Sequence, residues 1–349
     1  MRILVTGGTG FIGAHSVAAL LRAGHEVRML VRNPVAVAPA LRPLGVDATE
    51  VGTSAGDVTD RDAVRRAVAG CDSVLHAAGV YSFDSRDVAA MRRVNAPGTE
   101  VVLGTARAAG LDPIVHVSTF GALLPGPDAG SGAPLSTAAA IGTARDAYLR
   151  TKADAERIAR RHQADGAPVV ITYPPAVLGP YDDRLGDQVT RLRNALRGLM
   201  PMWPSGGFPI GDVRDTAALH AGLMRPGLGA RRYFGPGRYV STRDYVRTLR
   251  EVTGRTLPTV FLPARAMLPI GALVGVLQRA VPVHLPAEHG AVYLCATARP
   301  YDAAATDALL GTGARPLYVT LADTVAWLHA TGRLGRRLSG RAARISETV

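Results

Sequence analysis

A cluster of glycines near the N-terminus constrains the fold of this chain more than any other feature of its sequence. The cluster follows a short apolar run at residues 2–6 and consists of Gly7, Gly8, Gly10 and Gly13. Residues 11–23 then have the spacing of a helix, and a second apolar run occupies residues 27–31. Glycines at these points let the backbone turn tightly, approach a pyrophosphate and pack a helix against a strand. The segment therefore predicts a strand, turn, helix and second strand that bind a dinucleotide, rather than a glycine-rich turn without a ligand.

The start of the predicted helix supplies the groups that would hold the phosphates. Unpaired backbone amides and the positive end of the helix dipole both favour an anion at this place. We therefore expect the cofactor to contact the turn and the first helical residues, which are Gly7, Gly10, Phe11, Ile12 and Gly13.

The residue after the second predicted strand distinguishes between the two nicotinamide dinucleotides. A carboxylate here accepts a hydrogen bond from the ribose 2′-hydroxyl of NAD(H) and repels a 2′-phosphate. This chain has Arg32 there, and a guanidinium binds phosphate well. Arg28 lies four residues earlier on the same face of the strand and is expected to assist. The sequence favours NADP(H), with NAD(H) as the alternative if Arg32 is an ordinary surface arginine.

Strand and helix patterns continue to alternate after this unit. Strand-like runs at residues 73–76 and 114–117 are separated by a long helical stretch at residues 88–109. Crossovers of this length indicate a parallel sheet, whose ligands lie beyond the carboxyl ends of the strands. The expected fold class is α/β, with a Rossmann-type doubly wound parallel sheet and a smaller, mostly C-terminal substrate domain. Further cofactor contacts are expected at the strand ends, from Asp57, Val58, Ala77, Ala78 and Gly79.

The only lysine of the chain lies four residues after a tyrosine. Of the 40 lysine and arginine residues, all but Lys152 are arginines, and Lys152 follows Tyr148 on a predicted helix over residues 147–163. Side chains four apart on a helix start roughly 5–6 Å from each other. An ammonium beside a phenol lowers the pKa of the phenol, which makes tyrosine a better proton donor and acceptor near neutral pH. The pair predicts a general acid/base; the alternative is a half-buried tyrosine beside a lysine that extends to solvent.

The order and spacing of several short motifs resemble those of extended short-chain dehydrogenases/reductases. The resemblance is to the branch that includes dihydroflavonol reductases, 3β-hydroxysteroid dehydrogenases and nucleotide-sugar epimerases. The motifs span most of residues 1–220 and occupy residues 6–13, 31–34, 56–58, 76–79, 94–99, 117–119, 148–152, 174–180 and 212–215.

This resemblance implies a role for each matching residue. Tyr148 would be the general acid/base, and Lys152 would lower its pKa and hold the nicotinamide ribose. Thr119, rather than Ser118, would orient the substrate carbonyl. The loop that lies along the nicotinamide would contribute Pro174 and Val177.

Three functions are compatible with these residues. The first is an NADP(H)-dependent reductase or dehydrogenase that acts on a carbonyl or alcohol of a fairly apolar small molecule. The second is an NAD-dependent nucleotide-sugar epimerase, and the third is a non-catalytic NADP-binding sensor. The acid/base residues argue against a sensor. Phe120 and Gly121 stand where related sugar dehydratases have an acidic pair, and Arg32 disfavours the NAD of an epimerase. We therefore expect an oxidoreductase.

The division of the chain follows from these motifs. An NADP-binding Rossmann domain is expected over residues 1–180, completed by about 206–237, and a substrate-binding domain over residues 181–205 and 238–330. The apolar stretch within residues 261–277 fits a hydrophobic substrate site, and equally a core helix or the interface of a homodimer. Residues 121–145 are rich in small residues and are expected to form a movable wall of the site, or a merely variable surface loop.

Composition limits the remaining possibilities. The net charge of +12 is concentrated in part in residues 331–349, a basic tail expected to be solvated and frayed. No nucleic-acid motif accompanies its arginines, so we expect no nucleic-acid partner. Two distant cysteines exclude a disulfide framework, and no metal site is expected. The apolar residues 266–283 are interrupted by prolines and polar residues, so no integral membrane segment is expected. We expect a cytoplasmic protein.

Overall fold

The computed structural model describes residues 1–125, 134–144, 146–264, 266–267 and 289–347. Its largest element is a seven-stranded sheet in the order β10-β6-β5-β4-β1-β2-β3, in which every neighbouring pair is parallel. The strands are β1 (Arg2–Thr6), β2 (Glu26–Val31), β3 (Val51–Ala55), β4 (Ser73–His76), β5 (Ile114–Val117), β6 (Val169–Tyr173) and β10 (Arg231–Phe234). The strand order reverses between β1 and β4. This is the doubly wound sheet expected from the sequence, and the reversal is the position at which such sheets bind ligands.

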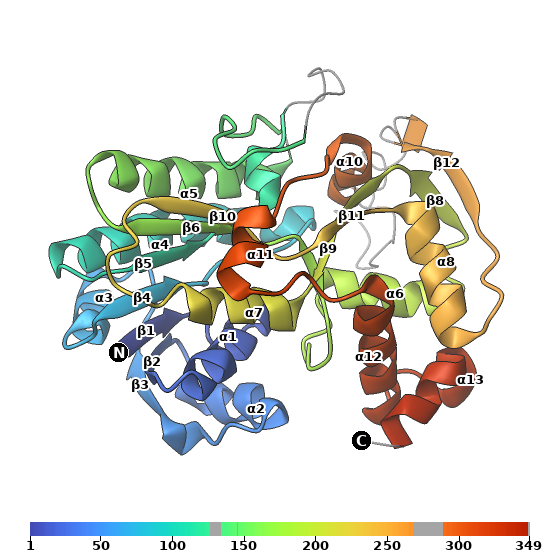
Figure 1. Cartoon of the computed structure of the whole chain (residues 1–349), viewed down its shortest axis with the longest axis horizontal. Coiled ribbons are helices and arrows are strands. Elements are labelled where there is room, and N and C mark those ends of the chain that lie inside the picture. Colours follow the sequence, from blue (N-terminus) through green and yellow to red (C-terminus); the bar gives the residue numbers. More distant parts are fainter. Residues whose placement is uncertain (126–133, 145, 265, 268–288, 348–349) are drawn as a thin grey trace.

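Helices cover both faces of the sheet (Figure 1). One face carries α1 (Phe11–Arg22), α2 (Val37–Leu41) and α7 (Val213–Gly222), with α11 (Ala304–Leu310) beside α7. The other face carries α3 (Arg61–Val68), α4 (Val88–Ala108) and α5 (Ala147–Ala164). Short 3-10 turns lie at η1 (Pro34–Ala36), η2 (Arg42–Leu44), η3 (Ala48–Glu50), η4 (Ser85–Asp87) and η5 (Phe120–Leu123).

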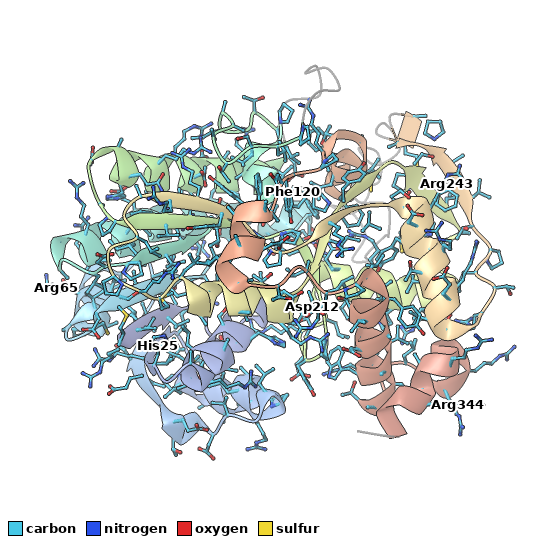
Figure 2. All side chains as sticks on the ribbon, in the orientation of Figure 1. His25, Arg65, Phe120, Asp212, Arg243 and Arg344 are labelled. Atoms are coloured by element: carbon cyan, nitrogen blue, oxygen red, sulfur yellow. The ribbon has the colours of Figure 1, made fainter. Side chains whose placement is uncertain are left out.

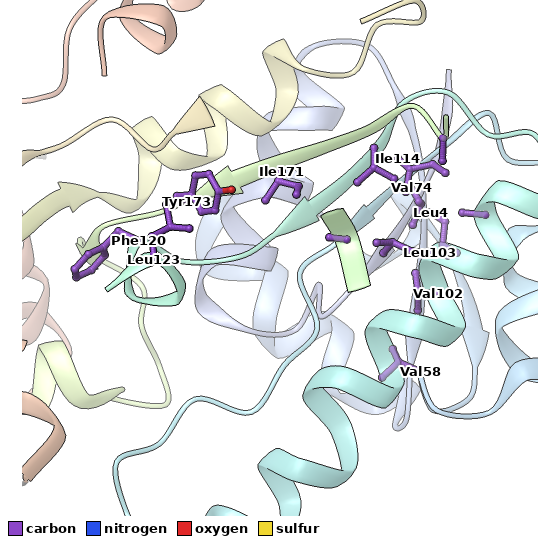
Figure 3. Close-up of a cluster of buried hydrophobic side chains, with 14 of the residues drawn as sticks. Leu4, Val58, Val74, Val102, Leu103, Ile114, Phe120, Leu123, Ile171 and Tyr173 are labelled. Atoms are coloured by element: carbon purple, nitrogen blue, oxygen red, sulfur yellow. The ribbon is translucent and has the colours of Figure 1, made fainter. Parts of the chain in front are cut away.

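The two faces have separate hydrophobic clusters because side chains alternate along each strand. On β1, Leu4 belongs to the cluster under α3, α4 and α5, whereas Ile3 and Val5 belong to the cluster under α1 and α7. Figure 3 shows the first cluster, which runs from Leu4 across the sheet to Tyr173. Burial on both faces explains why these strands are continuous apolar runs.

A second, smaller unit lies beside the carboxyl ends of the strands (Figure 1). Its strands are β7 (Ala176–Leu178), β9 (Gly207–Asp212) and β11 (Arg238–Ser241) in one sheet, and β8 (Met202–Ser205) and β12 (Val260–Pro263) in another. Its helices are α6 (Asp187–Leu196), α8 (Thr242–Thr253), α10 (His289–Thr297), α12 (Leu317–Ala330) and α13 (Arg336–Ser339), followed by η6 (Gly340–Glu347). A third hydrophobic cluster, centred on Trp203, Tyr245 and Trp327, holds this unit together.

The division between the two units differs from the sequence-based expectation at two places. β9 was expected in the first unit, but it pairs with β7 and β11, and Phe208 and Ile210 belong to the third cluster. The expectation of a frayed basic tail is wrong for the residues described there. α13 and η6 pack against α8 and α12, and Leu334 and Ala342 are 2% and 0% exposed. Small apolar residues spaced along one side of this segment give it a buried face that its arginines obscure in the sequence.

The remaining expectations for loops concern residues that the structure describes only in part. Most of the apolar stretch at 266–283 lies outside the described residues. Of the expected movable wall, residues 134–144 are held in place: Leu135 pairs with Tyr301, and Ala139 accepts a hydrogen bond of 2.8 Å from the Arg160 guanidinium. In the described part of the chain, no helix is both long enough and apolar enough to cross a membrane.

Candidate active site

The glycine turn lies between β1 and α1 at the switch in strand order. Gly7 has φ of 74°, and a Cβ there would lie 2.6 Å from the carbonyl carbon of Ala77. A Cβ on Gly13 would lie only 2.1 Å from the Gly7 oxygen. Both positions therefore require glycine, because a side chain on Gly7 would push the turn away from the end of β4 and one on Gly13 would collide within the turn itself. α1 begins after Gly10, which provides no side-chain cap, so Phe11 and the following residues start the helix with uncapped amides.

The end of β4 packs directly against this turn. The amides of Ala77 and Ala78 donate to the Thr6 backbone and side-chain oxygens, at 3.1 and 3.3 Å. Asn95 on α4 then holds the next residues, because it accepts from the Val80 amide at 2.7 Å and donates to the Val80 carbonyl at 3.1 Å. Gly79 is exposed between these two anchors. The small residues at 77–79 thus form a floor beside the glycine turn.

Arg32 lies at the same edge of the sheet, directly after β2, and its side chain is exposed. The positive charge of Arg32 acts on Asp57, which lies just after β3. Burial alone would raise the pKa of Asp57, but two hydrogen bonds from Thr59 and the charge of Arg32 hold it below its ordinary value. Asp57 is therefore at least in part an ordinary turn aspartate.

Two neighbouring predictions need correction or refinement. Arg28 does not assist Arg32: its guanidinium donates to the carbonyls of Ala67 and Ala69, at 3.0 and 2.6 Å, and so caps the C-terminus of α3. Arg28 lies four strand residues, about 13 Å, before Arg32, which is too far for the two guanidinium groups to share one phosphate. The Val58 side chain packs in the first hydrophobic cluster, so only its backbone faces the edge.

α5 positions the tyrosine and the lysine. The Asp146 side chain caps the helix by accepting from the Leu149 amide at 3.1 Å, which places Tyr148 in the first turn. Lys152 follows one turn later, is 9% exposed, and donates from Nζ to the Val117 carbonyl at 3.0 Å. The helix therefore directs both side chains towards the end of β5.

The two hydroxyl residues after β5 point in different directions. Thr119 interacts with the Tyr148 hydroxyl through its side chain, in the sense that favours the ionised phenol. Ser118 is turned away and donates from Oγ to Glu156 at 2.8 Å. Thr119 is thus the hydroxyl beside the phenol, as the resemblance implies.

Lys152 does not act on Tyr148 in the expected way. Burial raises the pKa of Tyr148, the negative charge of Asp146 raises it further, and Thr119 only partly offsets both. The Lys152 ammonium is directed to the Val117 carbonyl rather than to the phenol, so it contributes no comparable lowering. Burial also lowers the pKa of Lys152 to about 8, although the carboxylate of Glu156 acts against this.

Two aromatic residues that sequence reasoning missed form a wall against Tyr148. The rings of Tyr81 and Phe83 meet the Tyr148 ring edge to face, with centroids 4.8 and 5.6 Å away. Tyr81 is 42% exposed and accepts a contact of 3.5 Å from Gln188 of α6. Two aromatics directly after the small residues at the end of β4 were a signal in the sequence that could have identified this wall.

A buried polar cluster lies next to Lys152 on the same helix. Glu156 is fully buried and accepts hydrogen bonds from Ser118 at 2.8 Å, Tyr173 at 2.7 Å and Arg160 at 2.7 Å. Glu156 follows Lys152 by one helical turn. The cluster therefore fixes the end of β5, the middle of α5 and the end of β6 relative to one another.

The expected nicotinamide loop follows β6. Pro174 is buried, and its carbonyl accepts from the Phe120 amide at 3.3 Å, which ties the loop to the segment after Thr119. Val177 on β7 is half-buried and pairs with Gly211 of β9. The loop thus joins the large sheet to the second unit. Among the described residues, no group of three or more potential ligand side chains is arranged to hold a metal ion.

The chain is similar to one protein family and to several known proteins over most of its length. The model of the NAD dependent epimerase/dehydratase family matches residues 3–227. Sterol demethylase protein B of Methylococcus capsulatus is 30% identical over 336 residues, which cover 96% of this chain and 100% of that protein. A putative dihydroflavonol 4-reductase of Synechocystis is 30% identical over 94% of both chains.

A similar solved structure confirms the fold. The UDP-glucuronic acid 4-epimerase of Bacillus cereus, solved with UDP-glucuronic acid and NAD, has a TM-score of 0.73 at 17% identity, over 95% of this chain and 100% of that one. The fold, the matched residues and the two relatives agree with the resemblance seen in the motifs. This chain therefore belongs to the NAD-dependent epimerase/dehydratase family and is an NAD(P)-dependent enzyme of the extended short-chain dehydrogenase/reductase type.

Proposed function

We propose that this protein is an NADP(H)-dependent oxidoreductase that interconverts a carbonyl and an alcohol on a fairly apolar small molecule. The position of Tyr148 carries the proposal, because its phenol meets Thr119 on one side and the rings of Tyr81 and Phe83 on the other. Aromatic walls exclude water and accept an apolar body. The names of the two relatives, a sterol demethylase protein and a putative dihydroflavonol 4-reductase, support a hydrophobic substrate.

Each residue of the site has a task in this reaction. NADP(H), when bound, supplies or accepts the hydride. Tyr148 donates its proton to the substrate oxygen in reduction and takes it back in oxidation. Thr119 holds the substrate oxygen beside the phenol. Lys152, whose pKa of about 8 leaves it mostly protonated at neutral pH, holds the nicotinamide ribose.

The cofactor contacts form one continuous path along the edge of the sheet. The glycine turn and the start of α1 would bind the pyrophosphate, and Arg32 would bind the 2′-phosphate. The floor at residues 77–79 and the loop from Pro174 to Val177 would line the remainder. We also propose that the large sheet and its helices bind the cofactor and that the second unit binds the substrate.

Replacement of Tyr148 by phenylalanine tests the reaction. Tyr148→Phe removes the proton donor but keeps the ring that packs on Tyr81 and Phe83, so cofactor binding and folding should persist. Turnover of apolar ketones should fall by about 100-fold or more. Steady-state oxidation of NADPH and cofactor titration of both proteins measure the two effects.

Lys152→Arg is a second variant for the same test. It preserves the positive charge, but the planar guanidinium does not fit the buried position beside the Val117 carbonyl, so most activity should be lost. Unchanged turnover in Tyr148→Phe would disprove the mechanism. Turnover of nucleotide sugars without net cofactor oxidation would favour an epimerase instead.

Replacement of Arg32 by aspartate tests the choice of cofactor. Arg32→Asp exchanges a phosphate-binding group for one that repels phosphate and accepts from a ribose hydroxyl. The ratio of the dissociation constants of NADP(H) and NAD(H) should shift by about 10-fold or more towards NAD(H). Arg28→Gln is the control, because Arg28 caps α3 and should leave this ratio unchanged. Equal binding of both dinucleotides by the wild-type protein would contradict the proposal.

A further inference from the structure

The second unit contains a cavity lined by both apolar and polar side chains. The described residues that line it include three methionines, Trp203 and Phe208, together with two polar side chains of α6, Gln188 and Arg191. The cavity volume is about 50 Å³, counted as the space open to the centre of a water-sized sphere. An apolar cavity with a few convergent polar groups is the usual form of a small-molecule site.

This cavity adjoins the aromatic wall of the active site. Gln188 lines the cavity and also donates from Nε2 to the Tyr81 hydroxyl at 3.5 Å. The Tyr81 ring in turn lies 4.8 Å from that of Tyr148. A row of neighbouring side chains therefore leads from the reacting group into the cavity, in the order Tyr148, Tyr81, Gln188 and Arg191. A substrate held at Tyr148 could thus extend its distal end towards α6.

Arg191 is the one charged side chain among the described residues that line the cavity. It donates from Nη1 to Oε1 of Gln188 at 3.0 Å, and no carboxylate lies within ion-pair distance of it in the described part of the chain. Its charge acts on the groups around it, since it lowers the pKa values of Tyr81, Tyr245 and Cys295 against the effect of burial. A guanidinium has five N–H donors. Most of these remain available to a ligand in a largely apolar cavity.

We propose that Arg191 binds a carboxylate at the distal end of an otherwise apolar substrate. A carboxylate accepts two parallel hydrogen bonds from a guanidinium, which matches an arginine that has no ion pair among the described residues. A nucleoside diphosphate would bring two phosphates and several hydroxyls, and the two polar side chains in the described lining of this cavity cannot satisfy them. This proposal gives the substrate class of the proposed oxidoreductase. The reaction of such a substrate rests on the proposed function, whereas its binding at Arg191 does not.

Binding measured without turnover tests the proposal. Trp203 lines the cavity, so its fluorescence reports occupancy, and Trp327→Phe removes the other tryptophan from the background. The probes are decanoate, decanol and UDP, titrated into the full chain. Decanoate should bind at least about 10-fold more tightly than decanol, because a hydrogen bond to a charged group is lost in the alcohol.

Variants of α6 complete the experiment. Arg191→Gln should abolish the preference for decanoate and leave decanol binding unchanged, and Arg191→Lys should keep part of the preference. Arg197→Gln is the matched control, because Arg197 is an exposed arginine at the end of the same helix. Equal binding of decanoate and decanol, binding of neither, or tighter binding of UDP would overturn the proposal. None of these results depends on whether Tyr148→Phe supports the oxidoreductase.

Discussion

Glu156 shows how a residue outside the reacting groups can govern the site. Its carboxylate accepts from three side chains and also opposes the effect of burial on the pKa of Lys152. Burial of an acid is costly unless hydrogen bonds and a nearby positive charge offset it, and Arg160 provides that charge. The residue therefore links the stability of α5 to the protonation of its lysine.

Replacement of Glu156 by glutamine tests this link. Glu156→Gln leaves the Arg160 guanidinium unpaired in a largely buried place and should lower the free energy of unfolding by about 3 kcal/mol. It should also lower the pKa of Lys152 below about 8, so the alkaline limb of the activity profile moves to lower pH. Urea midpoints and pH profiles measure the two effects.

A second acid on the same helix provides the control. Asp154 forms an ion pair with Arg157, but its side chain is 46% exposed. Asp154→Asn should change the free energy of unfolding by no more than about 0.5 kcal/mol, and the pH profile should not move. Similar losses in both variants would show that Glu156 has no special role.

Among the elements, the turn between β1 and α1 depends on its glycines for two different reasons. Gly13 is needed for packing within the turn, since its Cβ would collide with the Gly7 oxygen. Gly10 has an extended backbone with φ of −89°, and a Cβ there would lie 3.3 Å from the same oxygen, so alanine fits the turn only after a small shift of that oxygen. What Gly10 would provide is room for a phosphate.

Alanine at these two positions should therefore have different effects. Gly13→Ala overpacks the turn and should lower the free energy of unfolding by about 2 kcal/mol, in addition to weakening cofactor binding. Gly10→Ala should lower the free energy of unfolding by only about 1 kcal/mol, less than Gly13→Ala does, and should still weaken NADP(H) binding. Thermal unfolding with and without NADP(H) separates the two outcomes. Equal stability of the two variants would contradict this assignment.

The elements that the sequence predicted well are those specified by local pattern. The strand, glycine turn and helix, and the pair Tyr148 and Lys152, each lie within one short segment, so spacing alone places them. The wall of Tyr81 and Phe83 lies more than 60 residues before Tyr148, and only the packing of α4 against α5 brings it there. The direction of the Lys152 ammonium also depends on β5, a neighbour that helix periodicity cannot reveal.

At the scale of the whole molecule, a group of charges joins the second unit to the large sheet. Asp212, at the end of β9, caps α7 and accepts from Thr320 of α12 at 2.8 Å (Figure 2). Arg214 pairs with Asp212 and with Asp323 of α12, both at 2.7 Å. Three elements of both units therefore meet at Asp212, which is fully buried as a side chain.

The stability of this junction should depend on pH. Burial alone would raise the pKa of Asp212, but the hydrogen bonds and charge of Arg214 hold it below its ordinary value of about 3.9. A carboxyl with a lowered pKa stabilises the fold above about pH 4, and this contribution is lost as the pH falls through the lowered value. Urea midpoints should begin to fall below about pH 6.5, because burial lowers the pKa values of His76, His116 and His220, and the loss of the Asp212 contribution should add a further fall below about pH 4.

Asp212→Asn should lower stability at neutral pH and flatten the acid part of this profile. Asp165→Asn serves as the control, because Asp165 pairs with Arg107 at the surface with 48% of its side chain exposed. The control should keep the profile of the wild type. An unchanged acid profile in Asp212→Asn would show that other carboxyls set the acid limit.

The buried position of Lys152 has a practical consequence. Because the chain contains a single lysine, an amine-directed reagent can modify only one side chain, which lies in the candidate active site, besides the α-amino group of Met1. Lys152 is 9% exposed and donates to a strand carbonyl, so we expect its acylation to be slow and to be blocked by bound cofactor. Mass spectrometry after such labelling would show the fraction of molecules in which Lys152 carries the label. Cross-linking or immobilisation through lysine, by contrast, has no surface lysine to use, and both cysteines are buried, so surface carboxylates are the better choice.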